Sequence, residues 1–194
     1  MLQRYMLCMQ NLIKDITTNV NELSYIEAEN VAVGFKRSRD GANEEVWAEV
    51  TAVDLGDGAF LQKKEGRIEK FFSSQTLLMD GMPIKYVMDF YVPVFLTLPF
   101  RDKLVTVFHE LYHISPKFDG ELRTFKGRAY QHGPSKEKYD KYMEYLCDKY
   151  IKEDRDEFVD FLKETPVELI DTCKGSEIPK YPKPEPLLYR VTWC

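Results

Sequence analysis

The residues of this chain most able to do chemistry are its three histidines, which all lie between positions 109 and 132. Two of them belong to the segment His109-Glu110-Leu111-Tyr112-His113. In a helix, positions i and i+4 lie on the same face, so both imidazoles can point at one metal ion. Glu110 is about 100° round the helix from His109, close enough to reach a water on the ion without being a ligand. This is the H-E-x-x-H arrangement of zinc hydrolases.

The motif predicts a zinc-dependent peptidase that uses one Zn²⁺ ion and acts on a peptide or protein substrate. The ion would activate a water molecule by lowering its pKa towards neutrality, and it would also polarise the scissile carbonyl. Glu110 would act as the general base, accepting the proton of that water and passing it to the leaving amine.

Two histidines leave such a site short of a third protein ligand. His132 is the first candidate because it is the remaining imidazole and is followed by Gly133-Pro134, a loop that can be shaped around a site. Asp119 is the alternative because it follows His109 by ten residues, the spacing of the longer H-E-x-x-H-x-x-G-x-x-H pattern. That pattern needs glycine where this chain has Pro116, and proline cannot take a positive φ. If it is not a ligand, Asp119 is expected to orient a histidine.

Three further polar residues near the motif have possible roles in catalysis. Tyr130 is predicted to be catalytic, donating a hydrogen bond to the tetrahedral oxyanion. Arg123 or Arg128 could do the same or bind a substrate carboxylate. Each also has a structural alternative, since Arg128 could pair with Asp119 and Tyr130 could simply pack. The tyrosines between positions 139 and 150 are interpreted as packing residues.

The motif requires a helix, and apolar spacing predicts one over residues 100–114, after a buried strand over 84–92. That strand is expected to present an edge to which an extended peptide can add. Alternating apolar residues predict strands at 30–38 and 45–55, and Asp40-Gly41 between them predicts an antiparallel hairpin. Further helices are predicted at 1–16, 135–152, 153–164 and 165–172. The fold class is therefore α+β, with a small antiparallel or mixed sheet packed against the motif helix and additional C-terminal helices.

The central segment resembles a family of metallopeptidases found in phages and archaea, within the zincin group that includes the SprT-like proteins. The resemblance is carried by His109-Glu110-Leu111-Tyr112-His113-Ile114-Ser115-Pro116, Phe118-Asp119-Gly120, Arg123, Gly127-Arg128 and Tyr130-Gln131-His132-Gly133. It implies zinc ligands His109, His113 and His132, the catalytic base Glu110 and a zincin-like fold. It does not imply a substrate.

Composition limits the other function classes. The length of 194 residues predicts one domain over 1–178, which the resemblance implies is zincin-like, followed by a proline-rich tail over 179–194. The net charge of −5 makes nucleic acid an unfavoured partner, and the absence of a long apolar run excludes a membrane span. Four scattered cysteines suit a reduced, cytoplasmic protein.

Two other functions stay open at this stage. One is a DNA-associated repair protease of the SprT type, for which Arg37, Arg39, Lys63, Lys64 and Lys70 could supply a local basic surface. The other is a non-catalytic binding protein whose zinc site is structural and therefore closed by four protein ligands.

Overall fold

The computed structural model describes residues 2–38, 46–53, 60–65, 68–73, 77–79, 81–125, 132, 135–170 and 186–191. In the strands at 60–65, 68–73 and 186–191 it describes the backbone alone.

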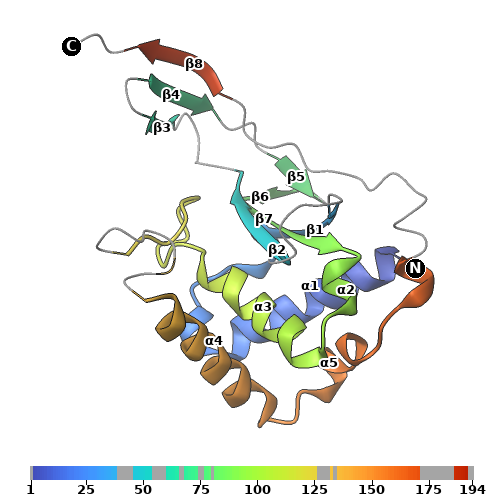
Figure 1. Ribbon diagram of the computed structural model, residues 1–194. Coiled ribbons are helices and arrows are strands. Elements are labelled where there is room, and N and C mark those ends of the chain that lie inside the picture. The colour runs from blue at the N-terminus through green and yellow to red at the C-terminus, as the bar shows by residue number, and fades with distance from the viewer. Residues whose placement is uncertain are drawn as a thin grey trace.

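The central sheet has three strands in the order β1-β7-β2, with bounds Val31–Arg37, Tyr86–Val92 and Ala48–Ala52. Strand β7 pairs with β1 in parallel and with β2 in the antiparallel sense, so the sheet is mixed. An ion-pair group formed by Lys36, Asp89 and Glu49 crosses all three strands, one residue from each. Figure 1 shows the helices together on one side of this sheet.

The predicted hairpin between the first two strands is wrong. Both strands form close to their predicted positions, but β7 lies between them and pairs with each. The Asp-Gly pair made a direct turn plausible, whereas β7 comes from more than thirty residues further along the chain and provides a partner for both strands. The prediction that the strand at 84–92 presents an edge is wrong for the same reason, because β7 is central and β2 is an edge strand.

Two smaller sheets complete the strands of the described chain. Strands β5 (Leu77–Met79) and β6 (Met82–Ile84) form an antiparallel pair. Strands β3 (Phe60–Glu65), β4 (Ile68–Ser73) and β8 (Pro186–Val191) form an antiparallel sheet with β4 at its centre. The segment predicted as a proline-rich tail therefore contains a strand.

The predicted helices are confirmed where the structure describes them. They are α1 (Leu2–Asn19), α3 (Phe100–Tyr112), α4 (Lys136–Ile151) and α5 (Asp156–Lys163), with a further short α2 (Val94–Thr97) and the 3-10 turns η1 (Asn21–Leu23) and η2 (Ala28–Asn30). A helical turn at 167–170 begins just after Pro166, as its sequence predicts. The chain is thus α+β with a mixed sheet. No helix within the described ranges is long and apolar enough to span a bilayer.

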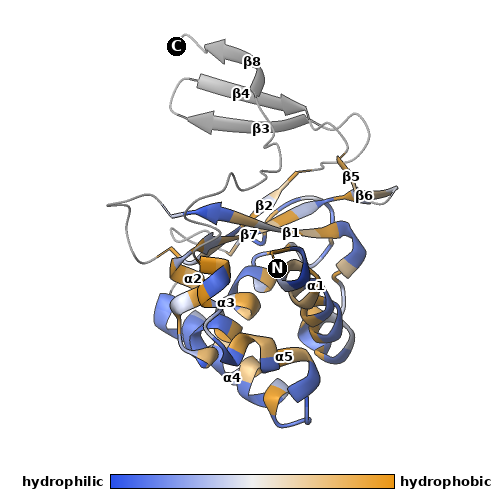
Figure 2. Ribbon diagram, turned by 90° about the vertical axis from the view of Figure 1, so that its right-hand side faces the viewer, coloured by the Kyte–Doolittle hydropathy of each residue, from blue (hydrophilic) through white to orange (hydrophobic). Residues whose placement is uncertain are grey.

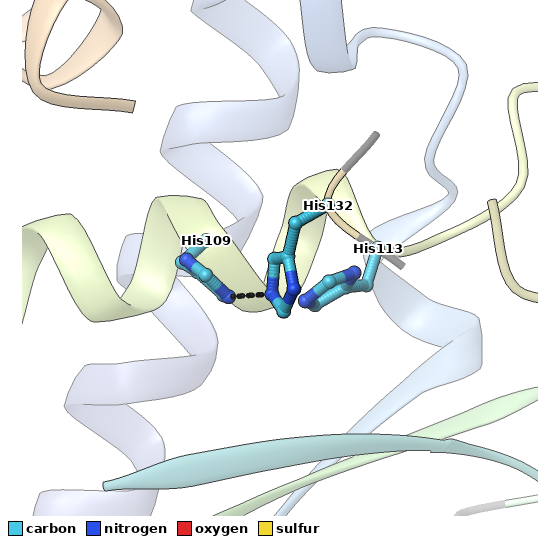
Figure 3. A group of neighbouring side chains, drawn as sticks. All are labelled: His109, His113 and His132. Atoms are coloured by element: carbon cyan, nitrogen blue, oxygen red, sulfur yellow. Dashed lines mark hydrogen bonds between the residues drawn. The ribbon is translucent and has the colours of Figure 1, made fainter. Parts of the chain in front are cut away.

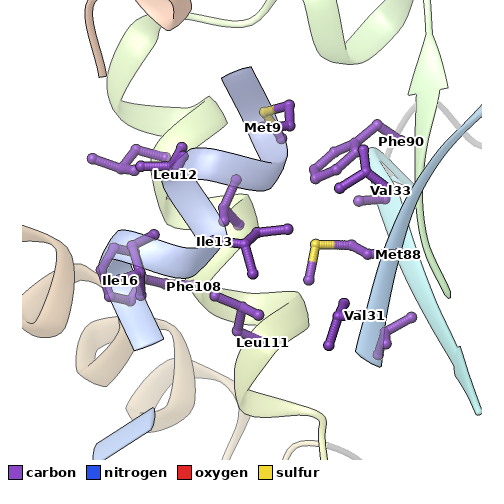
Figure 4. Packing of buried hydrophobic residues seen from close by; sticks show 14 of the residues in the cluster. Met9, Leu12, Ile13, Ile16, Val31, Val33, Met88, Phe90, Phe108 and Leu111 are labelled. Carbon is purple, nitrogen blue, oxygen red and sulfur yellow. The ribbon is translucent and has the colours of Figure 1, made fainter. Parts of the chain in front are cut away.

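The hydrophobic core lies between the central sheet and the helices. Figure 2 shows helices that are hydrophobic on one side and hydrophilic on the other, as expected for helices that cover a core. Figure 4 shows side chains of α1, α3, β1 and β7 meeting there. The labelled residues, all fully or almost fully buried, are Met9, Leu12, Ile13, Ile16, Val31, Val33, Met88, Phe90, Phe108 and Leu111.

The position of α3 is also determined by a buried lysine. Lys103 is 1% exposed, and its ammonium group donates hydrogen bonds to the carbonyl oxygens of Leu162 (3.0 Å) and Glu164 (2.9 Å). Those carbonyls end helix α5 and have no further helical turn to bond with. Lys103 therefore links the helix that carries the histidines to the last turn of α5.

We expect the substitution Lys103→Met to destabilise the fold by about 1–3 kcal/mol, because it keeps most of the side-chain volume but leaves the buried carbonyl of Leu162 without its donor. Urea unfolding followed by circular dichroism measures the change. The exposed Lys141, which pairs with Glu137 on α4, provides the control. Lys141→Met should change the unfolding free energy by less than about 0.5 kcal/mol. Equal stability of the two variants would contradict this role of Lys103.

Candidate metal centre

Three histidine side chains converge at the C-terminal end of α3. His109 and His113 are one helical turn apart on α3, and His132 reaches them from the segment between α3 and α4 (Figure 3). The Nε2 atoms of His109 and His132 are 3.0 Å apart. One ring nitrogen from each of the three histidines lies within 4.8 Å of the others.

The spacing of these nitrogens fits a shared metal ion. Two imidazole nitrogens bound to one tetrahedral zinc ion are separated by about 3.3 Å, since each Zn–N bond is about 2.0–2.1 Å long. The separation of His109 and His132 is already close to this value, and a ring nitrogen of His113 lies within 4.8 Å of both. The group could therefore hold one metal ion through three imidazoles.

The surroundings also keep these histidines in the neutral form that binds metals. Burial lowers the pKa of His109 to about 4, and the neighbouring His132 contributes to the shift. Burial likewise lowers the pKa of His113 to about 3, with smaller effects from the other two histidines and from Arg123. The pKa of His132 is also lowered, chiefly by burial. At neutral pH no proton has to be displaced from these rings before a cation binds.

Glu110 lies on α3 between the two helical histidines, and its residue is 7% exposed. Burial raises the pKa of its carboxyl group to about 7, the backbone N–H of Val50 opposes the shift by donating a hydrogen bond, and the nearby Glu49 raises the pKa further. Val50 belongs to β2, so this contact connects the motif helix to the edge of the central sheet. The carboxylate is thus held in a defined place beside the three imidazoles.

These groups open into a pocket of about 750 Å³ between α3, α4 and β2. Its walls combine the candidate metal ligands with charged residues of both signs and with the edge strand. Among the lining residues are Trp47, Ala48, Glu49, Val50, Asp102, His109, Glu110, His113, Arg123, His132, Lys136, Asp140 and Glu144. A volume of this size is typical of ligand-binding clefts.

Helix α4 contributes two residues to the centre that the motif did not indicate. The ring of Tyr139 packs against all three histidines, with centroid distances of 4.9 Å to His109, 5.6 Å to His113 and 5.0 Å to His132. Its hydroxyl donates a hydrogen bond to the backbone oxygen of His109. Asp140 places a carboxylate oxygen 3.9 Å from Nδ1 of His109. The tyrosine was predicted to pack, which is confirmed, but nothing in the sequence indicated what it packs against.

Asp119 lies in a turn rather than with the histidines. Its carboxylate accepts the backbone N–H of Glu121 at 3.3 Å, and the residues on either side, Phe118 and Gly120, have positive φ angles of 51° and 80°. The reversal of the chain after α3 begins with a turn across Pro116, closed by the bond from the N–H of Phe118 to the oxygen of Ser115, and the positive φ angles follow it at Phe118 and Gly120. In the described part of the chain, the group able to hold a metal ion consists of the three histidines alone.

Several other predicted residues cannot be placed. Tyr130 and Arg128 lie outside the described residues, as do Arg39 and the side chains of Lys63, Lys64 and Lys70 from the suggested basic surface. Arg123 is described, and it lines the pocket next to His113.

The chain was compared with protein-family models, with curated proteins and with solved structures, and none of the three comparisons gives a match. Function therefore has to be inferred from the residues of the pocket and their arrangement.

We expect Asp140→Asn to weaken metal binding about tenfold. Nε2 of His109 faces the other histidines while Nδ1 faces Asp140, so the carboxylate is placed to hold the ring by its second nitrogen. Competition between the protein and a chromogenic zinc chelator measures the affinity. Glu137→Gln, which removes an exposed carboxylate from the same helix, is the matched control and should bind zinc as the wild type does. Equal affinities for the wild type and both variants would rule out this role of Asp140.

Proposed function

We propose that the protein is a zinc-dependent peptidase. The observation that carries the proposal is the convergence of His109, His113 and His132 beside the buried carboxylate of Glu110, inside a pocket bordered by an edge strand. A zinc ion held by the three imidazoles would supply Lewis-acid activation of a water molecule and of the scissile carbonyl.

Glu110 is the general base in this proposal. Its carboxylate accepts a proton from the attacking water and then delivers it to the leaving amine nitrogen, so that the amide bond breaks and the proton count balances. The hydrogen bond from Val50 orients the carboxylate for both steps. Tyr130, predicted to donate a hydrogen bond to the oxyanion, stays a prediction.

Strand β2 is the element to which the peptide backbone is proposed to bind. The backbone oxygen of Trp47 accepts the N–H of Tyr91 on β7, and the N–H of Val53 donates to the oxygen of Lys85, just before β7. In an antiparallel pair of strands, residues whose backbone N–H and C=O face the partner strand alternate with residues whose N–H and C=O face away from it. The backbone groups of Ala48, Val50 and Ala52 are therefore directed away from β7. Val50 uses its N–H for Glu110, and the remaining outward groups can pair with an extended peptide. The peptide would then lie along the pocket, next to the histidines.

The number of ligands favours catalysis over a purely structural metal site. Structural zinc sites are usually closed by four protein ligands, whereas catalytic sites keep one position open for water or substrate. Within the described residues three ligands gather, and Asp119 is turned into its own loop. The family resemblance and the zincin-like fold are consistent with this proposal and stay predictions.

The proposal is tested by pairing zinc analysis with cleavage of a peptide library by the wild type and by Glu110→Gln. We expect both proteins to bind one zinc ion, because Glu110 is not a ligand. We also expect kcat/KM to fall by about 10²- to 10⁴-fold in the variant, because the general base is lost. Glu157→Gln, which changes an exposed carboxylate on α5, is the matched control and should keep full activity. Equal cleavage by all three proteins, or the absence of any cleavage by the zinc-loaded wild type, would refute the peptidase function.

A further inference from the structure

Arg123 is held rigidly at the edge of the candidate metal centre. Its Nε donates a hydrogen bond to the backbone oxygen of Tyr112 at 2.7 Å, and its Nη2 donates another to the hydroxyl of Tyr25 at 2.8 Å. The guanidinium carbon lies 3.9 Å from the centroid of the Tyr112 ring. The backbone N–H of Arg123 donates to the backbone oxygen of His113 at 2.6 Å. The side chain is therefore fixed in position next to a metal ligand.

These contacts leave much of the guanidinium group available. A guanidinium carries five N–H donors, and the two bonds above use two of them. Both acceptors are neutral, and no carboxylate among the described side chains lies within ion-pair distance of Arg123. Because Arg123 also lines the pocket, its remaining donors can be offered to a ligand there.

Charged residues line both ends of the pocket along α3, and Asp140 lies between them beside His109. Helices α3 and α4 run antiparallel, since Arg101 pairs with Asp148 while His109 lies by Asp140. Asp102 and Glu144 therefore line the end of the pocket near the start of α3, and Arg123 and Lys136 line the end near His113. His113 follows Asp102 by eleven positions, which is about 16 Å of helix. An extended peptide of about five residues covers that length.

We infer that Arg123 binds a carboxylate of the substrate, so that the enzyme prefers peptides with a negative charge on the His113 side of the bond that is cut. This inference rests on the proposed peptidase function and names the substrate class for the same pocket. A guanidinium with free N–H donors suits a carboxylate. The acidic residues at the other end disfavour the reversed orientation of such a peptide. The carboxylate can be the C-terminus of a short peptide or the side chain of Asp or Glu.

Binding is measured by calorimetry with the full-length, zinc-loaded Glu110→Gln protein, because loss of the general base slows cleavage of the ligand during the titration. The probes are alanine-rich pentapeptides in two pairs: one with a free or an amidated C-terminus, and one amidated pair with an internal Glu or Gln. We expect the dissociation constant of at least one charged peptide to be about 10- to 100-fold lower than that of its neutral partner. The pair that shows the difference identifies the source of the carboxylate.

The variants separate recognition from folding. In the Glu110→Gln background, Arg123→Gln should remove the difference between charged and neutral peptides, and Arg123→Lys should keep part of it because the charge remains. Lys117→Gln, which neutralises an exposed cation six residues earlier in the same loop, should keep all of it. Thermal unfolding of each variant establishes that it is folded before binding is compared.

Equal binding of charged and neutral peptides, or no binding of either, would overturn the inference. So would a difference that persists in a folded Arg123→Gln protein. These outcomes are distinct from failure of the peptidase proposal. A protein that prefers carboxylates but whose zinc-loaded wild type cuts no peptide would refute the catalytic function alone, whereas a peptidase without the preference would refute only the role of Arg123.

Discussion

The site depends on one helix that has to serve the core and the pocket at the same time. The period of α3 places Leu104, Phe108 and Leu111 in the hydrophobic core, where each is fully buried. The same period turns His109 and His113 towards the pocket, one turn apart on the neighbouring face. Moving the register by one residue would turn every side chain by about 100°, so the packing that stabilises α3 also determines where the imidazoles point.

The elements around α3 complete the centre from distant parts of the chain. Strand β2 brings the N–H of Val50 to Glu110, and helix α4 brings Tyr139 and Asp140 to the histidines. The turn after α3 is fastened to the sheet, because the hydroxyl of Tyr86 on β7 accepts the N–H of Gly120 and donates to the backbone oxygen of Glu121. These contacts surround a small set of polar groups with helices and strands that are fixed in place. Enzymes need such an arrangement to place reacting atoms accurately.

Local patterns in the sequence predicted most of the helices, the central buried strand and the pairing of His109 with His113, whereas His132 was predicted as the one remaining imidazole of the sequence. They did so because helical spacing and motif spacing are properties of neighbouring residues. The pairing of β1 and β2 was mispredicted because the position of β7 between them depends on contacts across more than thirty residues. Asp140 was missed for a similar reason, since its proximity to His109 follows from how α4 packs on α3. Arg123 was noted as a possible carboxylate ligand, but its two tyrosine partners only become visible in the fold.

The central claim is that three imidazoles of this chain hold one zinc ion and leave a position open. Zinc K-edge X-ray absorption of the full-length protein loaded with one equivalent of zinc tests it most directly. The account predicts about four nitrogen or oxygen ligands at about 2.0–2.1 Å, with the multiple-scattering signal of three imidazoles. A shell of sulfur ligands at about 2.3 Å, or a spectrum with fewer than three imidazoles, would contradict it.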